Sequence, residues 1–180
     1  MTYYGSQELA RAFRTVRGNT IQIAEEIPED RYGFQPAPGT RSVAETLAHV
    51  AVMPRVQEKV HFEDRLSTLV GFDFFGMMNA LMAESRKPRT KAEILDLLRT
   101  EGDRYAGLLE SSTEEFLGES VRYPEGMNPP AKSRFEMLIS PKEHEMHHRA
   151  QLMLVERMIG ITPHLTRHMQ ERIAAIAAQK

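Results

Sequence analysis

The chain has 180 residues, of which 41% are hydrophobic and 27% charged, with a formal net charge of -2 at pH 7. This composition is typical of one globular domain and excludes a disordered chain, while the slightly negative charge argues against a nucleic-acid partner. The absence of cysteine excludes disulfides, thiolate metal sites and a cysteine nucleophile. Any metal must therefore have nitrogen or oxygen ligands, and any thiol chemistry needs an external thiol.

The sequence shows neither a membrane span nor a signal peptide, and both bear on where the protein is located. No apolar run approaches the roughly 20 residues that a membrane span needs. The N-terminus also lacks the basic and apolar regions of a signal peptide. We expect a cytoplasmic protein with no membrane partner.

The first half of the chain has helical periodicity. Residues 6–27 carry one apolar stripe at three- and four-residue steps. Residues 28–40, with three prolines and two glycines, predict a loop. Ser42-Val43-Ala44-Glu45 is a capping box, in which each end's side chain accepts the other's free N–H, so a second helix should begin at Val43. Pro54 should kink or end that helix.

The next part of the chain is less regular. Residues 62–78 predict a loop that leads into a short helix from about Phe74 to Glu84. Its methionines are expected to fill gaps in the core, with a dimer seam or an adaptable pocket wall as the alternatives. If exposed, this stretch would favour a homodimer.

Further capping boxes begin at Thr90, Ser133 and Ser140. The first starts a long helix, whereas residues 112–132 predict mostly a surface loop. The last long helix either starts at Pro141 or runs from Arg134 with a kink, and it ends at Gly160. Thr162-Pro163 opens a terminal helix.

No stretch alternates with period two, so we predict no strand. The predicted fold is all-α: a four-helix bundle with extra short helices and a C-terminal helical extension. We expect a single domain over residues 1–180, with its core at about 6–163 and the extension at 164–180.

Three of the seven histidines lie in Glu143-His144-Glu145-Met146-His147-His148-Arg149. Residues four apart on a helix share one face, so His144 and His148 can converge on one metal ion. A His144/His147 pair is also compatible with the spacing. A catalytic site usually takes three protein ligands and leaves one position open. The candidates for the third ligand are His49, His61, His164 and His168.

The same segment fits H-E-x-x-H, the zinc metallopeptidase pattern in which the glutamate, here Glu145, is the general base. The extended pattern fails, because Gln151 and Leu154 stand where it requires glycine and histidine. Glu171 could serve as the third ligand. Against a peptidase, the chain offers no predicted strand edge for an extended peptide.

Two segments resemble motifs of the DinB/YfiT-like superfamily. Residues 34–50 resemble its proline-rich loop, capped helix and metal histidine, with Phe34 in place of the usual tryptophan. Residues 144–152 resemble its H-E-x-H-H-R-G-Q motif, with Ala150 in place of the usual glycine. The resemblance implies a four-helix bundle, often dimeric, whose metal ligands are His49, His144 and His148. His147 would then lie behind the ligands, where Glu145 and Gln151 could also support the imidazoles.

The resemblance also implies an activity. Family members with assigned activities resemble S-transferases that use bacillithiol, mycothiol or glutathione, or mycothiol-dependent isomerases. We therefore expect a divalent-metal-dependent enzyme that transfers a low-molecular-weight thiol to a small electrophile. Zinc is the first expectation for the metal, with nickel or another first-row ion as the alternative. The rival hypotheses are a non-enzymatic bundle that binds a metal or a ligand, and the metallopeptidase.

Overall fold

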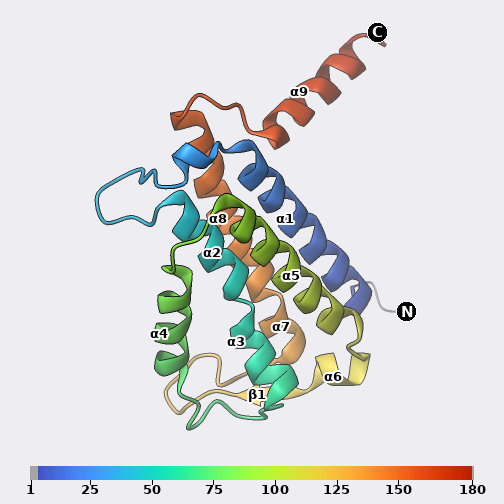
Figure 1. Ribbon diagram of the computed structural model, residues 1–180. Helices are drawn as coiled ribbons and strands as arrows, with labels where there is room; N and C mark the ends of the chain where they lie inside the picture. The colour runs from blue at the N-terminus through green and yellow to red at the C-terminus, as the bar shows by residue number, and fades with distance from the viewer. Residues whose placement is uncertain (1–3, 180) are drawn as a thin grey trace.

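The computed structural model describes residues 4–179, which are mainly helical (Figure 1). The α-helices are α1 (Ser6–Glu26), α2 (Val43–Val52), α3 (Arg55–Glu58), α4 (Phe74–Ser85), α5 (Lys91–Glu110), α6 (Glu114–Gly118), α7 (Arg134–Leu138), α8 (Ser140–Met158) and α9 (His164–Ala177). A 3-10 turn (Glu29–Arg31) and a π-helical turn (Lys59–Glu63) complete the helical segments. The predicted domain bounds of 1–180 include residues 1–3 and 180, which lie outside the described part.

Four of these helices form the bundle. Helix α1 contacts α5 and α8, and α2 contacts the same two helices, so the four enclose a common interior (Figure 1). The prediction of an all-α, four-helix bundle is confirmed. Large side chains that are fully buried fill this interior: Phe13, Ile23, Leu47, Ile94, Leu98, Tyr105, Leu109, Leu138 and Leu152.

The buried side chain of Arg17 links all four helices through one ion pair and two hydrogen bonds to backbone carbonyls. Arg17 of α1 donates from Nε to both carboxylate oxygens of Glu145 on α8, at 2.9 and 3.1 Å. Its Nη1 donates to the carbonyl of Leu98 on α5, and its Nη2 to that of Val50 on α2. Gly102 of α5 makes room for this side chain, because a Cβ atom there would lie 2.9 Å from Arg17 Cγ.

Residues 112–132, predicted as mostly a surface loop with at most a short turn of helix, also contain two strands. After α6, strands β1 (Ser120–Arg122) and β2 (Ala131–Ser133) pair in antiparallel fashion. The prediction of no strand is therefore wrong. Three-residue strands are too short to display a period-two pattern. In β1 only Val121 is buried, where it packs against Val60 and Met137.

Two prolines lie at helix boundaries, as the sequence predicts. Helix α2 ends at Val52, and Pro54 is the N-cap of α3. Helices α7 and α8 are separated only by Ile139, so the segment from Arg134 is a kinked helix with Pro141 in its first turn after the break.

The remaining helices lie outside the bundle's four. Helix α4 packs on α2, and its Met77 and Met78 contact a small core cluster with Val52 and Val56, as expected of gap-filling methionines. Helix α9 contacts α1 and extends beyond the end of the bundle (Figure 1). Within residues 4–179, no helix combines the length and apolarity required to cross a membrane.

Candidate metal centre

Two well-defined helices carry the predicted ligands. Helix α2 begins with the predicted capping box: Ser42 Oγ accepts the N–H of Glu45, whose carboxylate accepts the N–H of Ser42 at 2.8 Å. His49 lies in the last turns of this helix. His144 and His148 lie one turn apart on α8, which packs against α2.

The three imidazoles meet through their Nε2 atoms. His144 Nε2 lies 3.1 Å from His49 Nε2 and 3.1 Å from His148 Nε2, and the three donor atoms all lie within 4.8 Å of one another. Zn–N bonds of about 2.0–2.1 Å in a tetrahedron place neighbouring nitrogens roughly 3.3 Å apart. The two spacings of 3.1 Å therefore fit nitrogen ligands of one divalent ion.

The surroundings favour neutral imidazoles. Burial, assisted by the positive charge of Arg41, lowers the pKa of His49 to about 3. Burial, assisted by the neighbouring His148 and His147, lowers the pKa of His144 to about 4. Burial also lowers the pKa of His148. A neutral imidazole keeps the nitrogen lone pair that a metal requires, so the cluster offers three such lone pairs near neutral pH.

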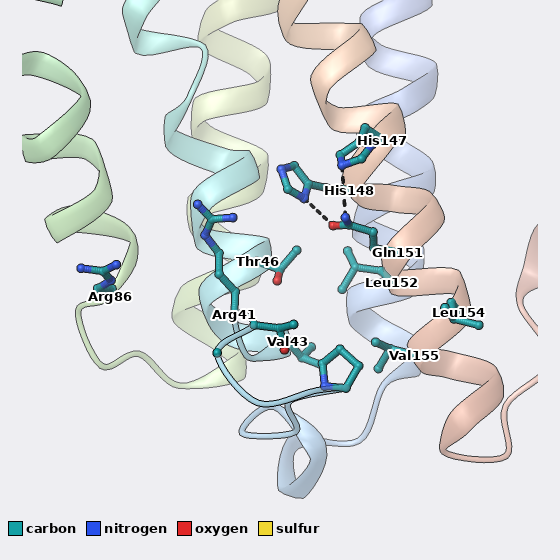
Figure 2. Close-up of a pocket in the computed structure, with 13 residues that line it drawn as sticks. Arg41, Val43, Thr46, Arg86, His147, His148, Gln151, Leu152, Leu154 and Val155 are labelled. Atoms are coloured by element: carbon teal, nitrogen blue, oxygen red, sulfur yellow. Dashed lines mark hydrogen bonds between the residues drawn. The ribbon is translucent and has the colours of Figure 1, made fainter. Parts of the chain in front are cut away.

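A side-chain relay orients one of these rings. His148 Nδ1 donates to Gln151 Oε1 at 2.8 Å, and Gln151 Nε2 lies 3.1 Å from His147 Nε2 (Figure 2). A hydrogen bond at Nδ1 leaves the lone pair of His148 on Nε2, toward the cluster. His49 lacks such support, because its buried Nδ1 has no hydrogen-bond partner within residues 4–179. A buried polar atom left unpaired costs free energy, so stability alone does not explain His49.

The other third-ligand candidates lie elsewhere. His61 is buried between Gln57 and Arg134. His164 is also buried, next to Asn19, and His168 is exposed on α9. Glu171, the carboxylate considered for a peptidase, is likewise exposed on α9. Within the described residues, the three-histidine cluster is the one group of metal-ligand type that converges.

Glu145 has a different role from those considered in the sequence. Its side chain is 1% exposed, and both of its oxygens accept hydrogen bonds from Arg17. Among the described residues, the carboxylate is thus bound to the buried guanidinium of Arg17 and forms no hydrogen bond with the histidine rings of the cluster.

Two clefts open beside the cluster. One, of about 540 Å³, lies between the loop before α2 and α8 and is lined by Arg41, His147, His148 and Gln151 among others (Figure 2). The other, of about 510 Å³, is bordered by His49 and His144 and by side chains of α4. Both volumes suit a small molecule.

Comparison with known proteins identifies the family. The model of the DinB superfamily matches residues 12–152. The chain belongs to the DinB superfamily. A relative of unknown function, YjoA of Bacillus subtilis strain 168, is 24% identical over 161 residues, which cover 87% of this chain and 92% of YjoA.

Solved structures share the fold. The crystal structure of YjoA, a DinB-like protein, has a TM-score of 0.61 at 22% identity and covers 86% of this chain and 94% of its own. Bacillus subtilis YfiT, described as "a probable metal-dependent hydrolase with an unusual four-helix bundle topology", has a TM-score of 0.69 at 14% identity, with 90% and 91% covered. An uncharacterised protein of Clostridium difficile 630 has a TM-score of 0.62 at 12% identity, with 88% and 99% covered.

One residue of the site was not singled out by sequence reasoning. Arg41 precedes the capping box and borders both clefts. A lone arginine at the end of a Pro/Gly-rich loop has no distinguishing local pattern, and only the packing of α2 against α8 brings it to the cluster.

Proposed function

We propose that His49, His144 and His148 together bind one divalent metal ion, zinc in the first instance and nickel or another first-row ion as the alternative. The observation that carries this proposal is the convergence of three neutral Nε2 atoms at the spacing of a tetrahedral site. Three protein ligands with a free position are the arrangement of catalytic zinc sites, whereas structural sites use four.

The reaction that we propose is the transfer of an external low-molecular-weight thiol to a small electrophile. The chemistry that a bound divalent ion supplies is Lewis acidity, which lowers the pKa of a thiol at the open position. In the transfer, a sulfur–carbon bond forms, the leaving group departs with its electron pair, and the thiol proton passes to solvent. The chain's own residues hold the reactants in the two clefts, while Gln151 keeps His148 in its ligating tautomer.

The lining of the clefts favours a thiol over water as the nucleophile. Hydrolysis at such a centre usually employs a general base, most often a histidine or a carboxylate, that takes the proton of water. His147 lines both clefts, but its Nε2 already accepts a hydrogen bond from Gln151. Neither cleft is lined by an aspartate or glutamate of the described residues, and Glu145 is held by Arg17. A thiol ionises more readily than water, so it needs less help from a base.

The test is a conjugation assay with the zinc- or nickel-loaded protein. Bacillithiol, mycothiol or glutathione is mixed with 1-chloro-2,4-dinitrobenzene, and the thioether is followed by its absorbance. We expect a rate above that of buffer with at least one thiol, lost in His148→Ala and kept in His168→Ala, whose exposed imidazole lies on α9. No enhancement with any of the thiols would contradict the transferase.

The same samples separate the alternatives. Hydrolysis of ester or amide substrates without a thiol would instead support a hydrolase, the activity in YfiT's description. Metal binding with no response to thiols or hydrolytic substrates would support a non-enzymatic bundle. Cleavage of casein that Glu145→Gln abolishes, with metal retained, would support the metallopeptidase.

A further inference from the structure

The charged side chains that line the cleft drawn in Figure 2 are all positive. Arg41 faces His148 and Gln151 across it, and Arg86, the residue that follows α4, lies at its edge. No aspartate or glutamate of the described residues lines this cleft. On a chain with a net charge of -2, this is a local concentration of positive charge without acidic neighbours.

Most of the other polar groups in the cleft already have partners. The hydroxyl of Thr40 donates to the carbonyl of Ala37 at 2.7 Å, and that of Thr46 to the carbonyl of Ser42 at 2.8 Å. Gln151 is engaged at both ends of its amide. The guanidinium groups are therefore the main donors left for a ligand.

Arg41 is held in place without a counter-charge. It is half-buried, and its Nη2 lies 3.3 Å from the neutral sulfur of Met82. Within residues 4–179, neither Arg41 nor Arg86 forms an ion pair with a carboxylate, although most arginines of the chain do. A cation left unpaired beside a cluster of three imidazoles is available to an anion.

The backbone adds no further donors at this point. The N–H groups of residues 42–44, at the start of α2, donate to the carboxylate of Glu45 and to the carbonyls of Phe34 and Tyr32. A phosphate site at a helix start usually needs such N–H groups to be free. A guanidinium fork alone matches a planar carboxylate, which it can bind through two parallel hydrogen bonds.

We propose that Arg41, assisted by Arg86, binds a carboxylate of the thiol co-substrate, so that the protein selects anionic thiols. This inference rests on the proposed function, since the thiol sulfur must reach the three-histidine cluster. The second cleft would then receive an apolar electrophile, because apolar side chains dominate its lining: Met53, Val56, Phe74, Met78, Met82 and Pro141. Flexible methionines would adapt to electrophiles of different shape.

The experiment measures thiol binding, not turnover. The cobalt-loaded protein is titrated with 3-mercaptopropionate and with 3-mercapto-1-propanol, which differ in the carboxylate, and the sulfur-to-cobalt absorption band gives each Kd. The titrations are repeated with Arg41→Gln and Arg41→Lys. Arg172→Gln serves as the control, because it removes one positive charge from an exposed position on α9.

We expect the acid to bind at least about tenfold more tightly than the alcohol, as charge-assisted hydrogen bonds imply. Arg41→Gln should bring this ratio close to one, mainly by weakening the binding of the acid. Arg41→Lys should keep part of the preference, and Arg172→Gln all of it. Equal affinities in the unaltered protein, or a preference that survives Arg41→Gln, would overturn the carboxylate site and leave the metal and thiol proposals intact. Cobalt binding without a thiol-dependent band for either compound would overturn the proposed transferase itself.

Discussion

Removing the charge of Glu145 should destabilise the bundle without preventing the proposed metal binding. In Glu145→Gln, the Arg17 guanidinium stays buried and keeps its hydrogen bonds to the carbonyls of Leu98 and Val50. It loses, however, its only counter-charge among the described residues. Breaking a buried ion pair on one side costs about 3–5 kcal/mol. Because the amide oxygen still accepts one hydrogen bond, we expect a loss of about 3 kcal/mol.

The assay is reversible unfolding of the metal-free protein, followed by circular dichroism. With a urea m-value of about 2 kcal/mol/M, the midpoint should fall by roughly 1.5 M, and Tm by about 6–12 °C. Glu143→Gln removes the same charge from an exposed position two residues away and should change stability by less than about 0.5 kcal/mol. Equal stability of the two variants would refute the structural role of Glu145. Loss of metal from a Glu145→Gln protein of unchanged stability would also refute this structural role.

Three other substitutions test particular contacts. Gln151→Ala should weaken metal binding by about 10- to 100-fold, because His148 Nδ1 loses its partner; competition with a chromophoric chelator measures this, and an unchanged affinity would contradict it. Gly102→Ala should lower the free energy of unfolding by about 1–3 kcal/mol, since the new methyl group meets Arg17; a gain in stability, which alanine normally brings within a helix, would show that Arg17 can move aside. Burial raises the pKa of Glu156 to about 7, so the folded state binds its proton more tightly than the unfolded state, and stability falls as pH rises from about 4.5 to about 7. Glu156→Gln should therefore match the unaltered protein near pH 4 and exceed it by about 3 kcal/mol at pH 8, and parallel urea-stability curves across pH would contradict this.

Local signals in the sequence predicted the elements that carry the site. The capping box at Ser42 defines the start of α2, and the four-residue spacing of His144 and His148 defines one face of α8. Those signals depend on neighbouring residues, so they can be read without knowing the fold. The choice of His49 over three other histidines came from the resemblance to a family, and the structure places its ring next to those of His144 and His148.

Contacts between distant segments could not be predicted in this way. Arg17 and Glu145 are 128 positions apart, and nothing near either residue indicates that they pair. His164 lies on a terminal helix, where solvated side chains are the rule, yet it is buried next to Asn19. The β1–β2 hairpin depends on tertiary packing of Val121 and not on a pattern within its short strands.

The most direct test of the central claim is the metal content of the purified, tag-free protein after reconstitution with zinc or nickel. The unaltered chain should hold about one divalent ion, and His49→Ala, His144→Ala and His148→Ala should each lose it while remaining folded. His168→Ala, an exposed histidine outside the cluster, should keep it. A protein that binds no ion, or one that keeps its ion after His49→Ala, would contradict a shared site built by α2 and α8.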